Sequence, residues 1–198
     1  MCDGNKAAAD YKVRPSPAPI IGWMTNTRLH ESSKRIMPMI FTKRCILRRM
    51  SLEDAEDLYS VLSDSEVMKY IEPPFDMEKT LEFIKSAGLC EPPLVLAVEW
   101  RETGRVIGHA VFHPYSESFY EIGWILRRDY WGKGIASELT SALTARAAEL
   151  KAAGCVMECD PQQAASGRIA IKNGFTYDGQ SGGLDIYRLA LTGYPEKV

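Results

Sequence analysis

The sequence has few of the residues that metal sites, disulfide frameworks and membrane spans require. It has three histidines and five cysteines among 198 residues, and no two cysteines form a C-x-x-C pair. An odd number of cysteines without metal-ligand spacing favours free thiols in a reducing compartment over disulfides or zinc. No run of about 18 apolar residues could span a bilayer. We therefore expect a cytoplasmic protein with neither a bound metal nor a membrane partner.

A strong charge of either sign is also missing. The formal net charge is −2, so no overall basic field would collect nucleic acid. Hydrophobic residues make up 45% of the chain and charged residues 25%, as in an ordinary globular protein. A chain of 198 residues is long enough to bury a real core within one domain.

The first part of the chain, residues 1–38, lacks any apolar period of 2 or 3.6 and contains four prolines. It has no apolar core of about 7–15 residues after a basic start, so it does not resemble a signal peptide. We expect a flexible extension followed by one domain over residues 39–198. Met37 or Met39 is an alternative start, because the domain pattern begins just after them.

Apolar periodicity and turn residues after position 39 predict an α/β domain with a largely antiparallel front half. Ser51 and Asp54 have the spacing of a capping box. Gly154 is expected to stop a helix, and residues 178–184 are expected to form a mobile glycine-rich loop. The expected strands are 41–49, 94–100, 106–113, 119–126, 155–159, 175–177 and 184–191, and the expected helices are 51–62, 66–71, 77–86, 135–150 and 164–172.

The most informative stretch runs from Phe119 to Leu150. An aromatic and β-branched strand leads into a loop with Gly132 and Gly134, and then into an amphipathic helix. A helix start exposes unpaired backbone N–H groups and the positive end of the helix dipole, so it attracts phosphate. Glycine lets the backbone approach an anion closely and adopt a positive φ. The stretch therefore predicts a phosphate-binding loop.

Two phosphate-loop types fit this stretch poorly. The chain contains no G-x-x-x-x-G-K-[ST] motif of a nucleotide triphosphatase. Gly132, Gly134 and Ser137 approach the G-x-G-x-x-G/A fingerprint of a dinucleotide-binding oxidoreductase. That fingerprint normally opens its domain, and too little chain follows here to build the two mononucleotide-binding halves.

The region from Phe41 to Leu191 resembles the GNAT N-acetyltransferases, in particular the RimJ/RimL branch that acetylates the N-termini of ribosomal proteins. Three paired stretches carry the resemblance, namely Leu47–Arg49 with Asp54–Leu58, Glu121–Trp124 with Tyr130–Gly134, and Gln163–Ser166 with Lys172–Phe175. They correspond to the opening strand and helix, to E-I-G-Y … Y-W-G-K-G, and to N-x-x-S … K-x-G-F. The resemblance implies the GNAT fold, which is a mixed, largely antiparallel sheet flanked by helices.

Three positions depart from the family pattern. Asp129 replaces the Gln or Arg that stands three residues before the first loop glycine, and Gln163 replaces the Asn of N-x-x-S. Many family members place a tyrosine seven residues after that Asn as the general acid. Ala170 occupies this position, so the role must fall to another residue.

The resemblance also implies a cosubstrate, acetyl-CoA, held between the fourth and fifth strands. Backbone N–H groups near Ile125 and Leu126 would hold the carbonyl oxygen. Arg127 and Arg128 would add charge near the phosphates, and Gln163 would take over the contact of the family's Asn. The diphosphate would rest on the N–H groups of Gly132, Lys133, Gly134, Ile135 and Ala136.

Two residues are candidates for catalysis. Glu121 is the candidate general base, because apolar neighbours in its strand should raise its pKa. Ser166 is the candidate proton donor to the thiolate or its orienter, although a helix N-cap is an alternative role for this serine. Tyr177 and Tyr187 are alternative phenolic acids.

These expectations describe an N-acetyltransferase that transfers acetyl directly to an amine, with no acyl-enzyme and no metal. The acceptor is a protein N-terminus or a small amine such as an aminoglycoside or a polyamine, and a homodimer is left open. The alternative from another class is a CoA-binding regulatory module without turnover, to which Gln163 and Ala170 point.

Overall fold

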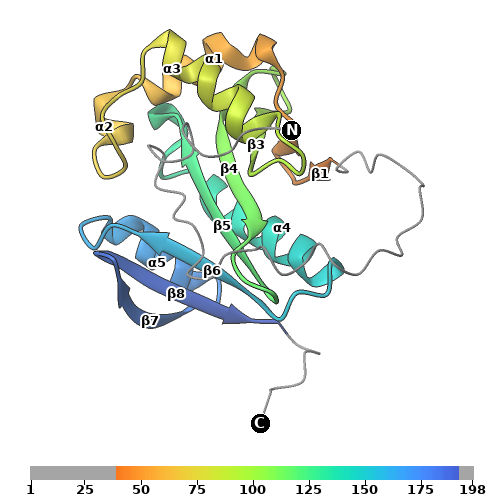
Figure 1. Ribbon diagram of the computed structural model, residues 1–198, viewed down its shortest axis with the longest axis vertical. Helices are drawn as coiled ribbons and strands as arrows, with labels where there is room; N and C mark the ends of the chain where they lie inside the picture. Colours follow the sequence, from red (N-terminus) through yellow and green to blue (C-terminus); the bar gives the residue numbers. More distant parts are fainter. Residues whose placement is uncertain (1–38, 192–198) are drawn as a thin grey trace, which may run out of the picture.

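The computed structural model describes residues 39–191. The predicted extension at residues 1–38 therefore lies outside the described residues. One eight-stranded sheet has the order β1-β2-β3-β4-β5-β6-β8-β7 (Figure 1). Its strands are β1 (Ile40–Phe41), β2 (Cys45–Arg48), β3 (Val95–Trp100), β4 (Val106–Pro114), β5 (Phe119–Leu126), β6 (Gly154–Cys159), β7 (Thr176–Ser181) and β8 (Leu184–Ala190). Neighbouring strands are antiparallel except β5 and β6, so the predicted mixed, largely antiparallel sheet is confirmed.

Helices cover both faces of this sheet. They are α1 (Ala55–Leu62), α2 (Ser65–Met68), α3 (Met77–Phe83), α4 (Ile135–Glu149) and α5 (Ala164–Lys172). A wider helical turn, 84–88, continues α3, and short 3-10 turns stand at 52–54 and 128–130. Within the described range, no helix is long and apolar enough to cross a bilayer.

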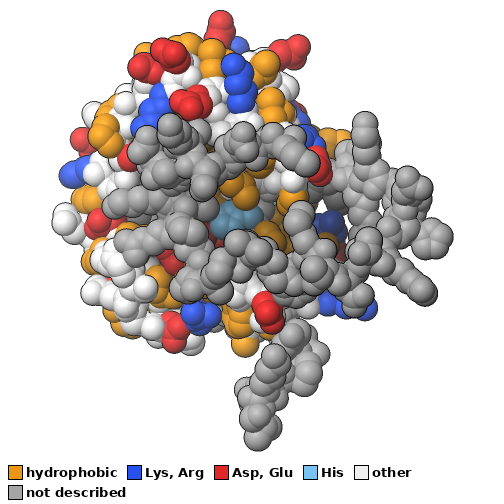
Figure 2. Space-filling view, in the orientation of Figure 1, with side chains coloured by type: hydrophobic (Ala, Val, Ile, Leu, Met, Phe, Trp, Pro, Cys, Tyr) orange, Lys and Arg blue, Asp and Glu red, His pale blue; other side chains and the backbone are white. Residues whose placement is uncertain are grey.

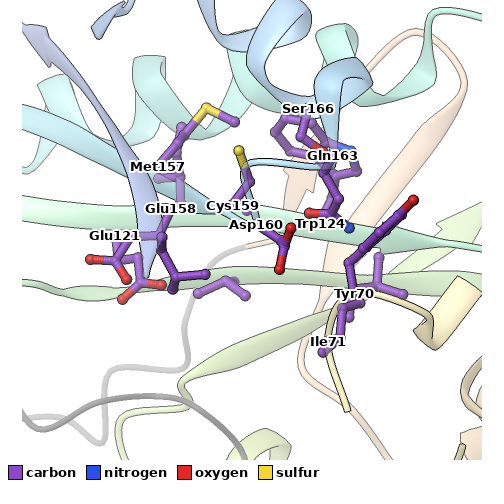
Figure 3. A pocket seen from close by; sticks show the side chains of 15 residues that line it. Tyr70, Ile71, Glu121, Trp124, Met157, Glu158, Cys159, Asp160, Gln163 and Ser166 are labelled. Atoms are coloured by element: carbon purple, nitrogen blue, oxygen red, sulfur yellow. The ribbon is translucent and has the colours of Figure 1, made fainter. Parts of the chain in front are cut away.

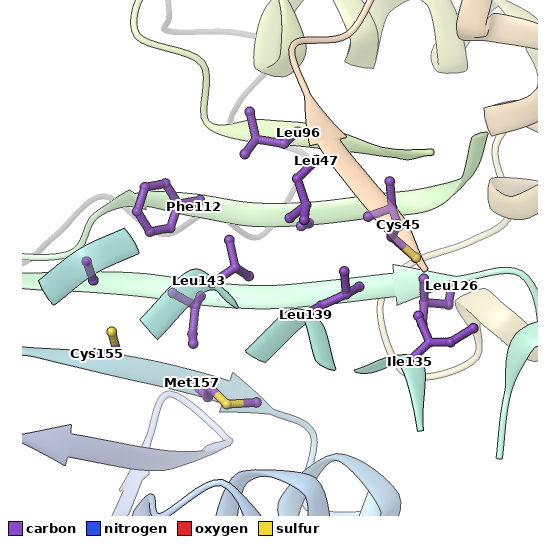
Figure 4. Packing of buried hydrophobic residues seen from close by; sticks show 14 of the residues in the cluster. Cys45, Leu47, Leu96, Phe112, Leu126, Ile135, Leu139, Leu143, Cys155 and Met157 are labelled. Atoms are coloured by element: carbon purple, nitrogen blue, oxygen red, sulfur yellow. The ribbon is translucent and has the colours of Figure 1, made fainter. Parts of the chain in front are cut away.

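The core has two layers because alternate residues of each strand point to opposite faces of the sheet. On one face, Leu139 and Leu143 of α4 pack against Phe112 of β4 (Figure 4). On the other face, Leu58 of α1 packs in a cluster with Ile125 of β5. Helices α1, α2 and α3 gather at one end of the molecule, and β6, β7, β8 and α5 form the other end (Figure 1).

Strands β5 and β6 pair over only three positions. Phe119, Tyr120 and Glu121 oppose Gly154, Cys155 and Val156, and no pairing continues beyond them. Since β5 runs on to Leu126, no strand within residues 39–191 pairs with the second half of β5 on its β6 side. This divergence is what positions the site described below.

Most predicted elements are confirmed, and β5 and α5 have the predicted bounds. The capping box is confirmed too, because the carboxylate of Asp54 accepts a hydrogen bond from the N–H of Ser51 at 2.8 Å. Both residues stand at the start of the turn that leads into α1.

Three local predictions were wrong. The first strand is divided in two, because the hydroxyl of Thr42 bonds with the backbone of Cys45 and turns the chain. Gly154 does not stop α4 but begins β6, where a Cβ would lie 2.3 Å from the carbonyl oxygen of Leu189. The mobile loop expected at 178–184 is a hairpin, since β7 extends through a bulge to Ser181 and pairs with β8.

Candidate active site

A cleft lies where β5 and β6 diverge. Its walls come from the second half of β5, the end of β6, the start of α5 and the chain just after α2. The lining residues are Tyr70, Ile71, Val111, Glu121–Ile125, Met157–Asp160, Gln163, Ser166 and Leu184 (Figure 3). In the space-filling view, a histidine side chain and neighbouring hydrophobic side chains are visible near the middle of the face shown (Figure 2).

Glu121 lies on the wall of this cleft, at the last position where β5 and β6 still pair. Its side chain is 21% exposed, and Nε2 of His113 on β4 lies 3.4 Å from its Oε2. Burial and, to a smaller extent, the neighbouring carboxylate of Glu158 together raise the pKa of Glu121 to about 7. A carboxyl group with a pKa near neutrality can hold or release a proton under physiological conditions.

Gln163 and Ser166 line the same cleft from the N-terminal end of α5. Gln163 is the N-cap residue, and its carbonyl oxygen accepts a hydrogen bond from the N–H of Ser166 at 2.9 Å. Ser166 is therefore inside the first turn rather than at the cap, and the alternative reading of this serine as the N-cap was wrong. Ala170 is fully buried in the core, where it offers no polar group to the cleft.

The two alternative phenols are placed differently from Ser166. A Cβ added to Gly167 would lie 2.5 Å from the hydroxyl of Tyr187, so this hydroxyl packs against the backbone of α5. Tyr177 is 53% exposed on the outermost strand, with its hydroxyl 3.5 Å from Asp185. Neither tyrosine lines the cleft.

The predicted phosphate loop joins β5 to α4. Gly132 and Gly134 have φ values of 70° and 75°, which a side chain would strain. Space does not require these glycines, because a Cβ on Gly132 would meet nothing within 4 Å and one on Gly134 would meet only Arg44, at 3.9 Å. Gly134 is the N-cap residue of α4, and Ile135, whose side chain is buried in the core, is its first residue.

Two side chains hold the loop in this shape. The indole N–H of Trp131 donates to the carbonyl of Leu126 at 2.7 Å and ties the loop to the end of β5. The guanidinium of Arg44 donates to the carbonyl of Lys133 at 2.8 Å and pairs with Glu138 of α4 at 2.8 Å. Arg44 was not identified from the sequence. An arginine in a turn before a strand carries no local signal that it will contact a loop about 90 residues later in the chain.

The cations near the loop have different partners. The guanidinium of Arg127 and the ammonium of Lys133 both approach the ring of Tyr130, at 5.1 Å and 5.5 Å from its centroid. Arg128 instead forms an ion pair with Asp64, the N-cap residue of α2, at 3.3 Å. Arg127 and Lys133 therefore lie together beside the loop, while Arg128 connects the loop to the helical end of the molecule.

Carboxylates dominate the charge of the cleft. Glu158 and Asp160, two positions apart at the end of β6, line it together with Glu121, and no lysine or arginine of residues 39–191 does. In Figure 3 the carboxyl groups of Glu121 and Glu158 lie near each other at one end of the cleft. The sequence reasoning missed Glu158 and Asp160, although their alternation places them on one face of the strand. Over the same residues, no group of three or more potential ligands could hold a metal ion.

Comparison with known proteins identifies similar chains. The family described as "Acetyltransferase (GNAT) domain" matches residues 44–176. YnaD of Bacillus subtilis (strain 168), described as an uncharacterized N-acetyltransferase, is 34% identical over 146 residues, which cover 71% of this chain and 84% of YnaD.

Solved structures share the fold. A GNAT-family acetyltransferase from Bacillus anthracis is 28% identical, with a TM-score of 0.70 over 77% of this chain and 98% of that one. RimL, described as a ribosomal L7/L12 alpha-N-protein acetyltransferase in complex with coenzyme A, is 19% identical, with a TM-score of 0.67 over 78% of this chain and 98% of RimL. At this identity, RimL shows a shared fold only.

Proposed function

The chain belongs to the GNAT acetyltransferase family, and from this premise we propose that its cleft binds acetyl-CoA and that Glu121 prepares an amine to attack it. Acetyl-CoA would supply the thioester whose acetyl group is transferred. The observation that carries the proposal is Glu121, a cleft carboxyl with a pKa of about 7. We assign the acetyltransferase domain to residues 39–198.

The edge of β5 suits the arm of the cosubstrate. Beyond Glu121, no strand of the described part of the chain pairs with β5 on its β6 side, which suits an extended chain of amides that needs backbone partners. We assign the contact with the carbonyl oxygen to the backbone near Ile125 and Leu126. Hydrogen-bond donors at this point would stabilise negative charge that develops on the oxygen during transfer.

The start of α4 suits the diphosphate. The N–H groups at a helix N-terminus have no partner inside the helix, and the dipole there favours an anion. We assign the diphosphate to the backbone of Gly132–Ala136, with Arg127 and Lys133 adding positive charge. The open space above both glycines is consistent with a ligand that approaches the backbone closely. Gln163, at the cleft end of α5, is the candidate for a further contact.

Two proton transfers complete the reaction. The acceptor ammonium must lose a proton before its nitrogen can attack, and the departing thiolate must gain one. Glu121 takes the first proton, either directly or through a water molecule. Ser166 is the candidate donor or orienter at the thiolate, because its side chain is half-buried on the cleft wall and is not needed as a helix cap.

The acceptor is a primary amine, and the lining favours one that carries additional positive charge. Glu158 and Asp160 stand beside the proposed base, and no cation of the described chain lines the cleft. Carboxylates would attract a cationic acceptor and disfavour an acidic one. Both a peptide N-terminus with basic residues and a small polyamine satisfy this requirement.

The test is thiol release from acetyl-CoA in the presence of a panel of amines. The panel contains peptides with basic, neutral or acidic second residues, spermidine and an aminoglycoside, and the N-acetylated form of each peptide is the control. We expect turnover that requires a free amine and is fastest with basic acceptors. Tight CoA binding without turnover for any amine would instead support the regulatory module.

A further inference from the structure

His113 is a buried titratable residue that the proposed mechanism does not use. It lies on β4 directly opposite Glu121 in the antiparallel pairing with β5. Its side chain is 8% exposed, and its Nε2 is 3.4 Å from Oε2 of Glu121. Among residues 39–191 this buried nitrogen has no hydrogen-bond partner, and the charged group that faces it is the Glu121 carboxyl.

The other ring nitrogen determines which proton His113 carries. Nδ1 lies 3.1 Å from the carbonyl oxygen of Pro114, and a carbonyl can only accept a hydrogen bond. The neutral imidazole must therefore carry its proton on Nδ1, which leaves a lone pair on Nε2 facing Glu121. A lone pair repels a carboxylate but accepts a hydrogen bond from a carboxylic acid.

We propose that His113 is a positioning residue for the general base: its Nε2 accepts a hydrogen bond from protonated Glu121 and so sets the pH at which Glu121 exchanges protons with the acceptor amine. This inference rests on the proposed function of Glu121. When Glu121 removes a proton from the acceptor, the amine N–H bond breaks and a carboxyl O–H bond forms. That O–H then donates a hydrogen bond to Nε2, and the proton need not move on to His113. After acetyl transfer, Glu121 releases this proton to solvent and becomes a carboxylate again.

The other charged and titratable neighbours do not replace this role. Glu158 on β6 faces Glu121 and also favours its protonated form. Tyr115 lies just after β4. Burial is the largest cause that raises the pKa of its phenol, and its interaction with Glu158, which includes a hydrogen bond, raises this pKa as well. Arg188 of β8 lies over the rings of Tyr115 and Phe119 and is paired with Asp178, and it is not among the groups that shift the pKa of Glu121. Burial lowers the pKa of His113, so the ring stays neutral where Glu121 titrates.

His113→Gln tests the inference because an amide can donate to the carboxylate, which the Nδ1-protonated imidazole cannot. We expect the acidic limb of the kcat/KM profile to shift about one pH unit lower, and kcat at the plateau to fall by about tenfold, since the base becomes weaker. His109→Gln is the matched control. His109 lies on the same face of β4 and is fully buried beside Phe83. Its substitution should leave the pH of the acidic limb of the kcat/KM profile unchanged.

A measurement on the unaltered protein covers the case in which the variant fails to fold. We expect ¹⁵N NMR to show His113 as the neutral Nδ1–H tautomer, and its Nε2 resonance to move as Glu121 titrates. The movement should vanish in Glu121→Gln. An Nε2–H tautomer, or an imidazolium at pH 6, would overturn the inference.

The two hypotheses fail in different ways. If Glu121→Gln retains full turnover, the proposed function of Glu121 is wrong. If Glu121→Gln is inactive but the limb stays fixed in His113→Gln, Glu121 is the base and His113 is only structural.

Discussion

The two ends of the segment 119–134 differ in which part of the chain carries the proposed chemistry, the backbone at the glycine loop and a side chain at Glu121. At the glycine loop, the proposed binding of an anion depends on backbone N–H groups, which the positive φ values of Gly132 and Gly134 position at the start of α4. At Glu121, the side chain matters, and its pKa is raised because β4 and β6 remove it from water. The first end depends on residue type in a short stretch, and the second depends on neighbours distant in the sequence.

This contrast shows why one segment can carry two steps of a reaction. The proposed diphosphate site does not require burial, since backbone donors and nearby cations can act on an anion at the surface. The base needs burial, since an exposed carboxyl would be ionised but too weak a base at neutral pH. A substitution in the loop should therefore lower the affinity for CoA, whereas a substitution of Glu121 should lower turnover.

The largest expected effect is at the buried end. Glu121→Gln cannot accept a proton, so turnover near neutral pH should fall by about 100- to 10,000-fold. The affinity for CoA should stay the same, because the loop at the other end is intact. Steady-state kinetics combined with calorimetric titration of CoA measures both. Turnover equal to that of the parent would show that the acceptor arrives already deprotonated or that another residue is the base.

The next effect is at the loop. Gly134→Val forces a β-branched residue into a φ of 75° and places its side chain where the ligand approaches. Losing one or two charge-assisted hydrogen bonds, at roughly 1.5–3 kcal/mol each, should weaken CoA binding by about tenfold to about 20,000-fold. Affinity for pantetheine, which lacks the diphosphate, should change much less.

Gly104→Val is the control for this loop variant. Gly104 has a similar φ of 69° in the turn between β3 and β4, with nothing within 4 Å of an added Cβ. It carries the same backbone strain without any contact with the proposed site. If both valine variants lose CoA affinity equally, the loss reflects folding, and the phosphate-loop assignment fails.

The smallest effect returns to Glu121 and concerns stability without ligand. Its pKa is about 7 in the folded protein against an ordinary value of 4.5, so the folded state binds the proton more tightly. Stability should therefore decrease as the pH rises from about 4.5 to about 7 and remain reduced above it. Glu121→Gln removes this penalty and should stabilise the protein by about 1–3 kcal/mol at pH 8, with little change below pH 4.5. Denaturant unfolding of the parent and of Glu121→Gln, at pH 8 and below pH 4.5, measures this difference in stability. Equal stability of the two proteins at pH 8 would contradict the burial argument.

Local sequence patterns predicted most of the elements that frame the site. The bounds of β5 and α5 follow from an aromatic, β-branched run and from a helix that ends before a glycine. The turn 178–184 was mispredicted because glycine-rich strands with a bulge have the composition of a loop. Ser166 lines the cleft, and it lies inside the first turn of α5 because Gln163 is the N-cap residue of that helix.

The sequence by itself determined the backbone of the proposed phosphate loop, since a positive φ at Gly132 and Gly134 and the start of α4 are local properties of the chain. It also determined that the chain resembles acetyltransferases. Only the tertiary structure decided the surroundings of the base. The divergence of β5 from β6 opens the cleft, His113 and Glu158 come from other strands, and Arg44 reaches the loop from the turn before β2. The physical reason is that desolvation and charge–charge interactions depend on distance in space, whereas a backbone conformation depends on the residue that adopts it.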